Sequence, residues 1–133
     1  MAITYSKKTD FLHEFILCAH GLVNLDKLKT VKDFRVPVTK NIRTEAQLHY
    51  YDPKNFTLTI NLYNHGVNAK GKTVSVRKYF AQVIDGLAHE LAHLKHFDHG
   101  PDHSILQAKI MLRMYRLAKK KGMTDMWQRW GKL

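Results

Sequence analysis

The sequence predicts an α+β fold, in which one helix precedes a small three-stranded sheet and two helices follow it. Apolar residues recur every three or four positions in three separate segments, which is the spacing of a helix with one buried face. Between the first and second of these segments, apolar residues alternate with other side chains, as in strands with one buried face. The predicted strands are residues 34–38, 46–51 and 56–63.

The first predicted helix covers residues 6–23, and Ser6 or Thr9 could cap its start. Its apolar face consists of Leu12, Phe15, Ile16, Ala19 and Val23. The lysine-rich residues 24–33 are predicted to be a polar connection that could contain a helical turn.

The predicted strands begin at Phe34, and Pro37 indicates that the first of them lies at a sheet edge. The second and third strands are joined by Asp52-Pro53-Lys54-Asn55, whose residue types are those of a tight turn. We therefore predict a β-hairpin, and residues 56–63 show its alternation most clearly.

A long helix is predicted to begin near Thr73 or Ser75 and to run to about Phe97. Its buried stripe consists of Val76, Phe80, Val83, Leu87, Leu91 and Leu94. The next helix should start at Pro101, because proline is favoured at a first helical position. Its buried stripe consists of Leu106, Ile110, Met114 and Leu117.

The long helix carries the motif H-E-x-x-H at residues 89–93. Residues four apart lie one turn above each other, so His89 and His93 can bind one metal ion from the same side. Glu90 projects towards another direction, from which it can take a proton from a water molecule at that ion. This is the division of roles in zinc peptidases, with two histidine ligands and a glutamate general base. Asp85 could orient the ring of His89, although we interpret it as a surface carboxylate.

A catalytic zinc ion needs a third protein ligand, and we favour His99. It lies just before Gly100-Pro101, which should end the helix and allow the chain to turn back towards the ion. His96 suits this role less well, because it would have to bind from the same rigid helix. His103, in the first turn of the next helix, is the rival ligand. A structural zinc site is usually closed by four ligands and rich in cysteine, whereas this chain has one cysteine.

The composition is that of a soluble protein of 133 residues, with 44% hydrophobic and 25% charged side chains. No apolar run is long enough for a membrane span, and the N-terminus lacks the apolar segment of a secretion signal. Cys18 is the only cysteine, which favours a reducing cytoplasm, and its apolar neighbours indicate a buried thiol. We expect a monomeric cytoplasmic protein of one domain, residues 1–133.

The formal net charge of +11 favours binding to polyanions, above all DNA or RNA, although a solubilising surface is the alternative. A basic line along the last helix is a candidate phosphate-binding track, formed by Lys109, Arg113, Arg116 and Lys120. In the basic tail, residues 119–133, Trp127 and Trp130 could stack on unpaired bases or could instead close the core.

The segment from His89 to His103 resembles the active segment of SprT-like (Spartan-like) zinc metallopeptidases and of the related YgjP-like and WLM-type groups. His89-Glu90-Leu91-Ala92-His93 matches the first part of their motif, and His99-Gly100-Pro101-Asp102 resembles the second. The resemblance implies a zincin-like fold, one catalytic Zn²⁺ held by His89, His93 and His99, and Glu90 as catalytic base. Two features differ: His103 replaces a usual aromatic residue, and no cysteine zinc ribbon follows.

These features predict a zinc-dependent metalloprotease that acts on proteins or peptides, and the resemblance implies that its substrates are associated with DNA. We expect an extended substrate to pair with the edge of the strand at residues 56–63. The main alternative is a non-catalytic basic DNA-binding protein with a structural zinc ion. A third hypothesis is a metal-dependent hydrolase of a non-peptide substrate.

Overall fold

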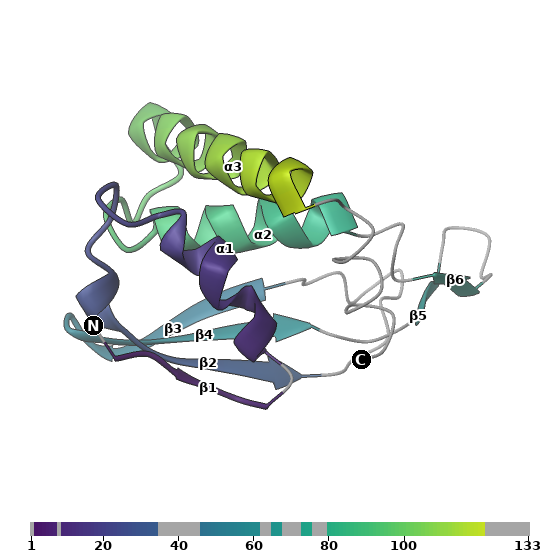
Figure 1. The fold of residues 1–133 in the computed structure, drawn as a ribbon. Helices are drawn as coiled ribbons and strands as arrows, with labels where there is room; N and C mark the ends of the chain where they lie inside the picture. Colours follow the sequence, from purple (N-terminus) through teal and green to yellow (C-terminus); the bar gives the residue numbers. More distant parts are fainter. Residues whose placement is uncertain are drawn as a thin grey trace.

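A four-stranded sheet, covered on one face by helices, forms the frame of the protein (Figure 1). The computed structural model describes residues 2–7, 9–34, 46–61, 65–67, 73–75 and 80–121. The strand order is β1-β2-β4-β3, in which β1 and β4 run parallel to β2 and β3 runs antiparallel to β4. The strands are β1 (Thr4–Tyr5), β2 (Leu28–Phe34), β3 (Ala46–Asp52) and β4 (Asn55–Asn61). A separate antiparallel pair is formed by β5 (His65–Val67) and β6 (Thr73–Ser75).

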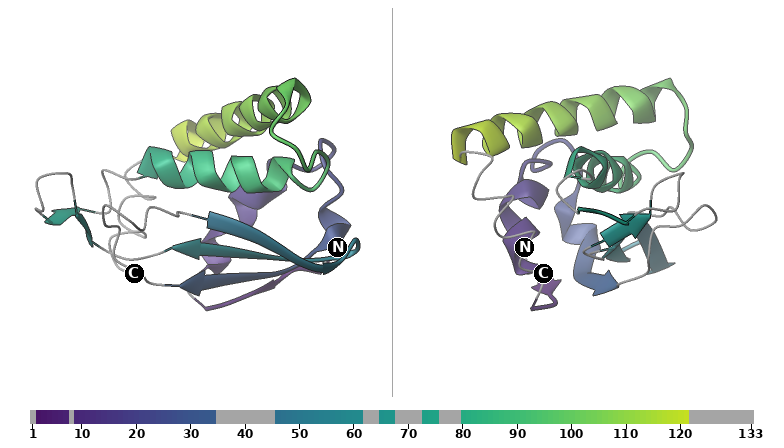
Figure 2. Two further views of the ribbon diagram at one scale, coloured as in Figure 1. Left: turned by 180° about the vertical axis from the view of Figure 1, so that it is seen from behind. Right: turned by 90° about the vertical axis from the view of Figure 1, so that its right-hand side faces the viewer.

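Helices α1 (His13–Leu17) and α2 (Phe80–Ala92) lie over the same face of the sheet, and α3 (Pro101–Lys121) lies over α2 as an outer layer (Figures 1 and 2). Two short 3₁₀ helices, η1 (Asp10–Leu12) and η2 (Leu25–Lys27), precede α1 and β2. This arrangement confirms the predicted α+β fold, with a sheet of four strands instead of three. None of the helices in the described part of the chain has the length and apolar character that crossing a bilayer requires.

The core lies between the sheet and the helices. Strand β4 shows how it is built: Phe56, Leu58 and Ile60 are fully buried, while Thr57 and Thr59 between them are half-exposed. Period-two alternation thus places one face of the strand against α1 and α2. Helix α3 contributes a helical stripe to the same core, which consists of Leu106, Ile110, Met114 and Ala118.

The predicted hairpin is confirmed, and its turn is stabilised by Asp52. The Asp52 carboxylate accepts hydrogen bonds from the Lys54 amide at 2.8 Å and from the Asn55 side chain at 2.5 Å. These bonds hold the pKa of Asp52 below its ordinary value, the Asn55 bond most strongly. The start of α3 at Pro101 is also confirmed.

The helical turn expected within residues 24–33 is present as η2, but the prediction of a polar connection is wrong from Leu28 onwards, because residues 28–33 belong to strand β2. Leu28 and Val31 are both buried although they are three residues apart, which is not the spacing of a regular strand. The register with β4 shifts between Leu28 and Thr30, so that Lys29 is an extra residue in the ladder. This bulge interrupts the alternation of apolar and polar residues, so the sequence pattern of this lysine-rich segment does not indicate a strand.

The first helix is shorter than predicted, although its five apolar residues are all buried. The α-helical part ends at Leu17, and i→i−3 hydrogen bonds carry the chain on to His20. Gly21, with φ of +83°, then turns the chain in a conformation that favours glycine. Thr9 does not cap the helix, because its buried hydroxyl bonds to the carbonyl groups of Ser6 and Val31.

The long helix also differs from its predicted bounds. Residues 73–75 form strand β6, and α2 begins at Phe80. After Ala92 the backbone hydrogen bonds change from the i→i−4 to the i→i−3 pattern, as between His93 N–H and the Glu90 carbonyl at 3.1 Å. The second motif histidine therefore lies on a tightened turn at the end of α2. Of the predicted strand at 34–38, Phe34 ends β2 and residues 35–38 lie outside the described part of the chain.

Candidate metal centre

Three histidine side chains converge beyond the end of α2. The Nε2 atoms of His89 and His93 are 3.2 Å apart, and His99 Nε2 lies 3.2 Å from the first and 3.0 Å from the second. His99 reaches this position from the loop between α2 and α3. The turn before Pro101 thus brings together the three residues that the spacing of the motif singled out.

The other ring nitrogen of two of these histidines has a carbonyl partner. His89 Nδ1 lies 2.9 Å from Gln107 Oε1, and His93 Nδ1 lies 2.9 Å from the backbone oxygen of His96. A carbonyl oxygen only accepts, so each Nδ1 carries the proton. A neutral ring that is protonated at Nδ1 has a lone pair at Nε2. Both rings therefore direct lone pairs at the same point.

Lone pairs that face each other at this distance repel, and a cation between them removes the repulsion. Zinc binds histidine nitrogen at about 2.0–2.1 Å in tetrahedral geometry, which places ligand nitrogens roughly 3.3 Å apart. The measured separations of 3.0–3.2 Å are close to that value. Burial also lowers the pKa of His93, which favours the neutral ring that a metal needs. His89, His93 and His103 are a group of close histidines that could hold a metal ion, and the Nε2 separations place His99 in the same cluster.

A fourth histidine, His103, belongs to the same cluster. Its possible ligand atom lies within 4.8 Å of those of His89 and His93, so these three residues are an alternative metal-binding group. However, His103 Nε2 lies 3.0 Å from the backbone oxygen of His89, to which it must donate. Its ring is buried and packs against His93 with centroids 4.2 Å apart. The donating Nε2 leaves Nδ1 as the nitrogen of His103 that could bind a metal. We favour the His99 group, because its three Nε2 atoms lie within 3.2 Å of one another.

Glu90 is half-buried beside the histidines. Its Oε2 accepts a hydrogen bond from the backbone amide of Leu48 in β3 at 3.0 Å. Burial raises the pKa of Glu90, whereas the nearby charge of His89 and the Leu48 bond lower it. A carboxylate whose affinity for a proton is raised, beside a possible metal site, has the properties of a general base.

The strand next to this site is β3, and this corrects the predicted substrate edge. Strand β4 contains most of residues 56–63, but it lies inside the sheet between β2 and β3. Both of its backbone edges are therefore occupied. Among the strands of the described residues, β3 lies at the outside of the sheet, and its Leu48 amide points away from β4 towards α2.

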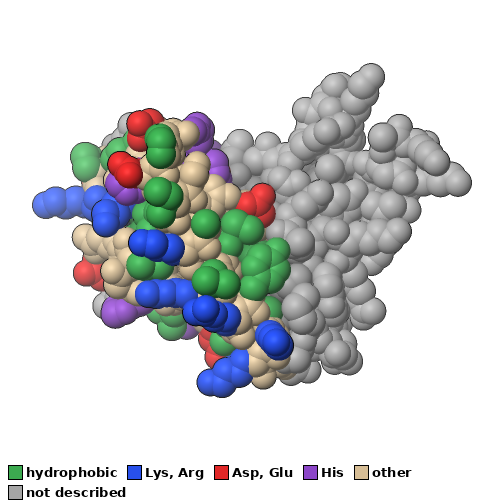
Figure 3. All heavy atoms as spheres, turned by 90° about the horizontal axis from the view of Figure 1, so that it is seen from above, with side chains coloured by type: hydrophobic (Ala, Val, Ile, Leu, Met, Phe, Trp, Pro, Cys, Tyr) green, Lys and Arg blue, Asp and Glu red, His purple; other side chains and the backbone are tan. Residues whose placement is uncertain are grey.

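The predicted basic line follows the exposed side of α3, where Lys109, Arg113, Arg116 and Lys120 are all exposed. The face seen from above α3 carries Lys and Arg side chains with hydrophobic side chains between them (Figure 3). Arg113 differs from the others, because its Nη1 donates to the carbonyl groups of Cys18 and His20 at 3.2 and 3.0 Å. Trp127 and Trp130 lie outside the described part of the chain.

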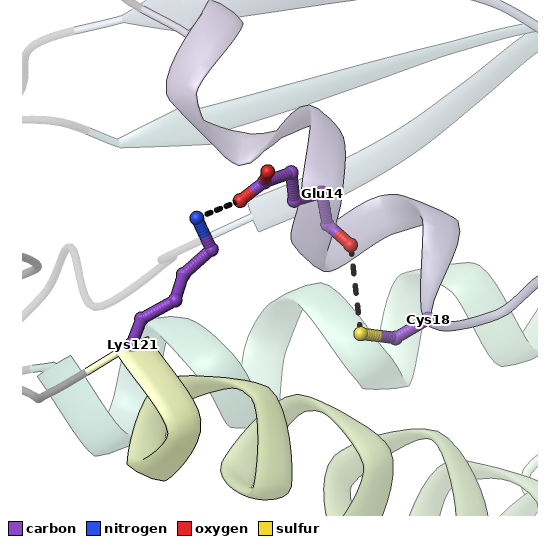
Figure 4. Close-up of polar contacts among 3 residues, drawn as sticks. All are labelled: Glu14, Cys18 and Lys121. Atoms are coloured by element: carbon purple, nitrogen blue, oxygen red, sulfur yellow. Dashed lines mark hydrogen bonds and ion pairs between the residues drawn. The ribbon is translucent and has the colours of Figure 1, made fainter.

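A further contact joins α3 to α1, because Lys121 forms an ion pair with Glu14 (Figure 4). Within the end of α1, the Cys18 thiol donates to the Glu14 carbonyl at 3.5 Å. The thiol is half-buried, and burial raises the pKa of Cys18, so it favours the protonated form. The C-terminal end of α3 is thus linked to α1 by an ion pair between exposed side chains.

Sequence analysis missed Gln107 altogether. This residue lies four positions after His103, so both belong to the face of α3 that meets α2, and this shared face was the available signal. Asp85 is exposed, as interpreted from the sequence, but it also accepts a hydrogen bond from Gln107 Nε2 at 2.7 Å. It therefore reaches His89 through Gln107.

Comparisons of the chain with protein-family models, with curated proteins and with solved structures found no match. The case for a function therefore depends on the geometry of the histidine cluster and on the residues around it.

Proposed function

We propose that the protein is a zinc-dependent metallopeptidase whose zinc ligands are His89, His93 and His99 and whose general base is Glu90. The observation that supports this most strongly is the convergence of three Nε2 atoms within 3.2 Å of one another beside a half-buried carboxylate. Imidazole ligands suit several transition metals, and three histidines with an open position are a common set for catalytic zinc.

When bound, the zinc ion would act as a Lewis acid towards a water molecule and a substrate carbonyl. Glu90 would accept a proton from the attacking water and later give it to the leaving amine. The Leu48 amide holds one oxygen of this carboxylate, which orients the other oxygen as the proton acceptor. The raised pKa of Glu90 improves its capacity to hold that proton between the two transfers.

We propose that an extended peptide substrate binds along the outer edge of β3. In an antiparallel strand, backbone amides two residues apart point the same way. Because the Leu48 amide points away from β4, those of Ala46 and Tyr50 also face outwards. A substrate would pair with these two amides, since Glu90 engages that of Leu48. A peptide that pairs with this edge would pass beside Glu90 and the histidines, where its scissile carbonyl is needed.

We further propose that the substrates are proteins associated with DNA, because the chain carries a net charge of +11. Lys109, Arg116 and Lys120 are exposed on α3 and would contact phosphates. Arg113 would contribute less, since two carbonyl groups already engage its guanidinium.

The experiment compares the wild-type protein with Glu90→Gln, using a basic DNA-binding protein as substrate with and without single-stranded DNA. Zinc content should be unchanged in the variant, and cleavage should fall by about 10²- to 10⁴-fold, the usual contribution of a general base. A variant that cleaves as fast as the wild type contradicts the assigned role of Glu90.

The same assay separates the alternatives. Cleavage stimulated by DNA supports the full proposal, and cleavage that DNA does not affect supports a peptidase with other targets. Salt-sensitive DNA binding without proteolysis would instead favour the non-catalytic DNA-binding protein. If the protein neither cleaves the substrate nor binds DNA, the remaining alternative is a hydrolase of non-peptide substrates.

A further inference from the structure

A chain of side-chain hydrogen bonds connects two helices at the metal centre. Asp85 on α2 accepts from Gln107 Nε2 on α3 at 2.7 Å, and Gln107 Oε1 lies 2.9 Å from Nδ1 of His89 on α2. We infer that Asp85 and Gln107 are positioning residues that fix the proton of His89 at Nδ1 and so keep its Nε2 available for the metal. This inference builds on the metal centre of the proposed function.

The direction of each bond follows from Asp85. An ionised carboxylate only accepts, so the Gln107 side chain must turn its NH₂ group towards Asp85. This orientation leaves the amide oxygen facing His89. Since that oxygen only accepts, His89 must carry its proton at Nδ1. Without Asp85, Gln107 could rotate by 180° and present its NH₂ group to the ring, which would then need its proton at Nε2.

His89 and His93 differ in what holds them. The Nδ1–H of His93 bonds to a backbone carbonyl only three residues away, so the local turn fixes this ring. The Nδ1–H of His89 bonds to a side chain that is eighteen residues away, on another helix. The packing of α3 against α2 is therefore a condition for a correctly oriented His89.

Helix α3 also holds the backbone of the same residue. His103 Nε2–H donates to the His89 carbonyl at 3.0 Å, and His103 and Gln107 are one helical turn apart. Helix α3 thus contacts His89 at both its main chain and its ring. Partners of metal-bound histidines typically change metal affinity by about 10- to 100-fold when they are removed.

The first measurement is ¹⁵N NMR of histidine-labelled, metal-free protein, which reports which ring nitrogen carries the proton. We expect His89 to be protonated at Nδ1 in the wild type and in the double variant Asp85→Asn/Gln107→Glu, in which the new amide at position 85 can donate to the new carboxylate and that carboxylate can accept from His89. In Gln107→Leu and in Asp85→Ala this preference should be lost or reduced. A wild-type His89 that is protonated at Nε2 would overturn the inference.

The second measurement is zinc affinity by competition with a chelator. Gln107→Leu should bind zinc about 10- to 100-fold more weakly, Asp85→Ala should be weakened less, and the double variant Asp85→Asn/Gln107→Glu should keep most of the affinity. Lys109→Gln, on the outer side of the same helix, is the matched control and should bind as the wild type does. Thermal unfolding identifies any variant that loses its fold, and Asp85→Asn/Gln107→Glu then still decides the question, because it preserves both hydrogen bonds of the chain.

An affinity of Gln107→Leu within twofold of that of the wild type would contradict the inference. Neither measurement involves proteolysis, so an inactive protein with the expected tautomer and affinities would overturn only the proposed peptidase activity. If the wild type binds no zinc, the metal centre itself is wrong, and the NMR spectrum still shows whether Gln107 sets the proton of His89.

Discussion

Two clusters of polar side chains in this protein differ in whether their hydrogen-bond acceptors are matched by donors. In the first, near the start of the chain, the Ser6 hydroxyl donates to the Asp33 carboxylate at 2.6 Å, and the buried Thr9 hydroxyl lies near two backbone carbonyl groups. In the second, the Nε2 atoms of His89, His93 and His99 lie within 3.2 Å of one another, and at least two of them present lone pairs. The first cluster pairs donors with acceptors, while the second opposes acceptor to acceptor.

His13, which lies outside the metal centre, resembles the first cluster because its ring nitrogen has a hydrogen-bond partner. His13 Nδ1 lies 2.8 Å from the Tyr5 hydroxyl, which can donate to it or accept from it. The nine histidines of the chain therefore do not by themselves indicate a metal site. A metal site is indicated by a group of ring nitrogens whose lone pairs face one another without a protein donor between them. A cation at their centre would remove the repulsion.

The largest expected effect is that of His99→Ala, compared with His13→Ala. Removal of a ligand should weaken zinc binding by more than the roughly 10- to 100-fold loss that follows removal of a ligand's partner. His13→Ala should leave zinc binding unchanged, because its ring already has a partner in Tyr5. Competition with a chelator measures both affinities. Full zinc content in His99→Ala would transfer the third position to His103.

The complementary experiment is Asp33→Ala, which disrupts the hydrogen-bonded cluster of Ser6, Thr9 and Asp33. Ser6 would lose its charged acceptor, and we expect a loss of about 1–3 kcal/mol in the free energy of unfolding, from denaturant titration. Zinc affinity should remain within twofold of the wild-type value. A large loss of zinc binding would show that the two clusters are coupled, which the structure gives no reason to expect.

A smaller effect is expected for His103→Phe, which keeps an aromatic ring and removes the bond to the His89 carbonyl. The variant should retain one zinc ion and lose about 1 kcal/mol of stability, the usual value of one hydrogen bond. Atomic absorption and thermal unfolding provide the two readouts. Loss of the metal in this variant, with retention in His99→Ala, would favour the alternative group of His89, His93 and His103.

The smallest effect near neutral pH is that of Tyr5→Phe. Burial raises the pKa of Tyr5 to about 12, from about 10 in an exposed tyrosine. The native state therefore favours the neutral phenol, which gives a stability contribution that is complete below pH 10 and is lost as the pH rises towards 12. Denaturant titration should show Tyr5→Phe gaining stability relative to the wild type over that range. An unchanged difference between them would contradict the raised pKa.

The parts of the fold that were predictable are those set by local patterns. The hairpin of β3 and β4 follows from alternation and from the Asp52 turn, and α3 follows from Pro101 and its apolar stripe. Strand β2 was missed because the extra residue Lys29 breaks its alternation, and its pairing with β4 is not local in sequence. The predicted start of α2 near Thr73 or Ser75 was wrong because these residues form β6, and the pairing of β6 with β5 leaves no trace in a helical pattern.

The candidate site divides in the same way. The spacing of His89, Glu90 and His93 is set by one helix and could be read directly from the sequence. The choice between His99 and His103 depends on where the loop and α3 place each ring, and both follow the motif at plausible distances. The contact of Gln107 with His89 joins two helices, so no local pattern contains it.

The most direct test of the central claim is anomalous X-ray diffraction at the zinc edge from crystals of the zinc-loaded protein. We predict a single peak at about 2.0–2.1 Å from Nε2 of His89, His93 and His99, with His103 still bonded to the His89 carbonyl. A peak coordinated by His103 instead of His99, or no peak among the four rings, would contradict the proposed metal centre.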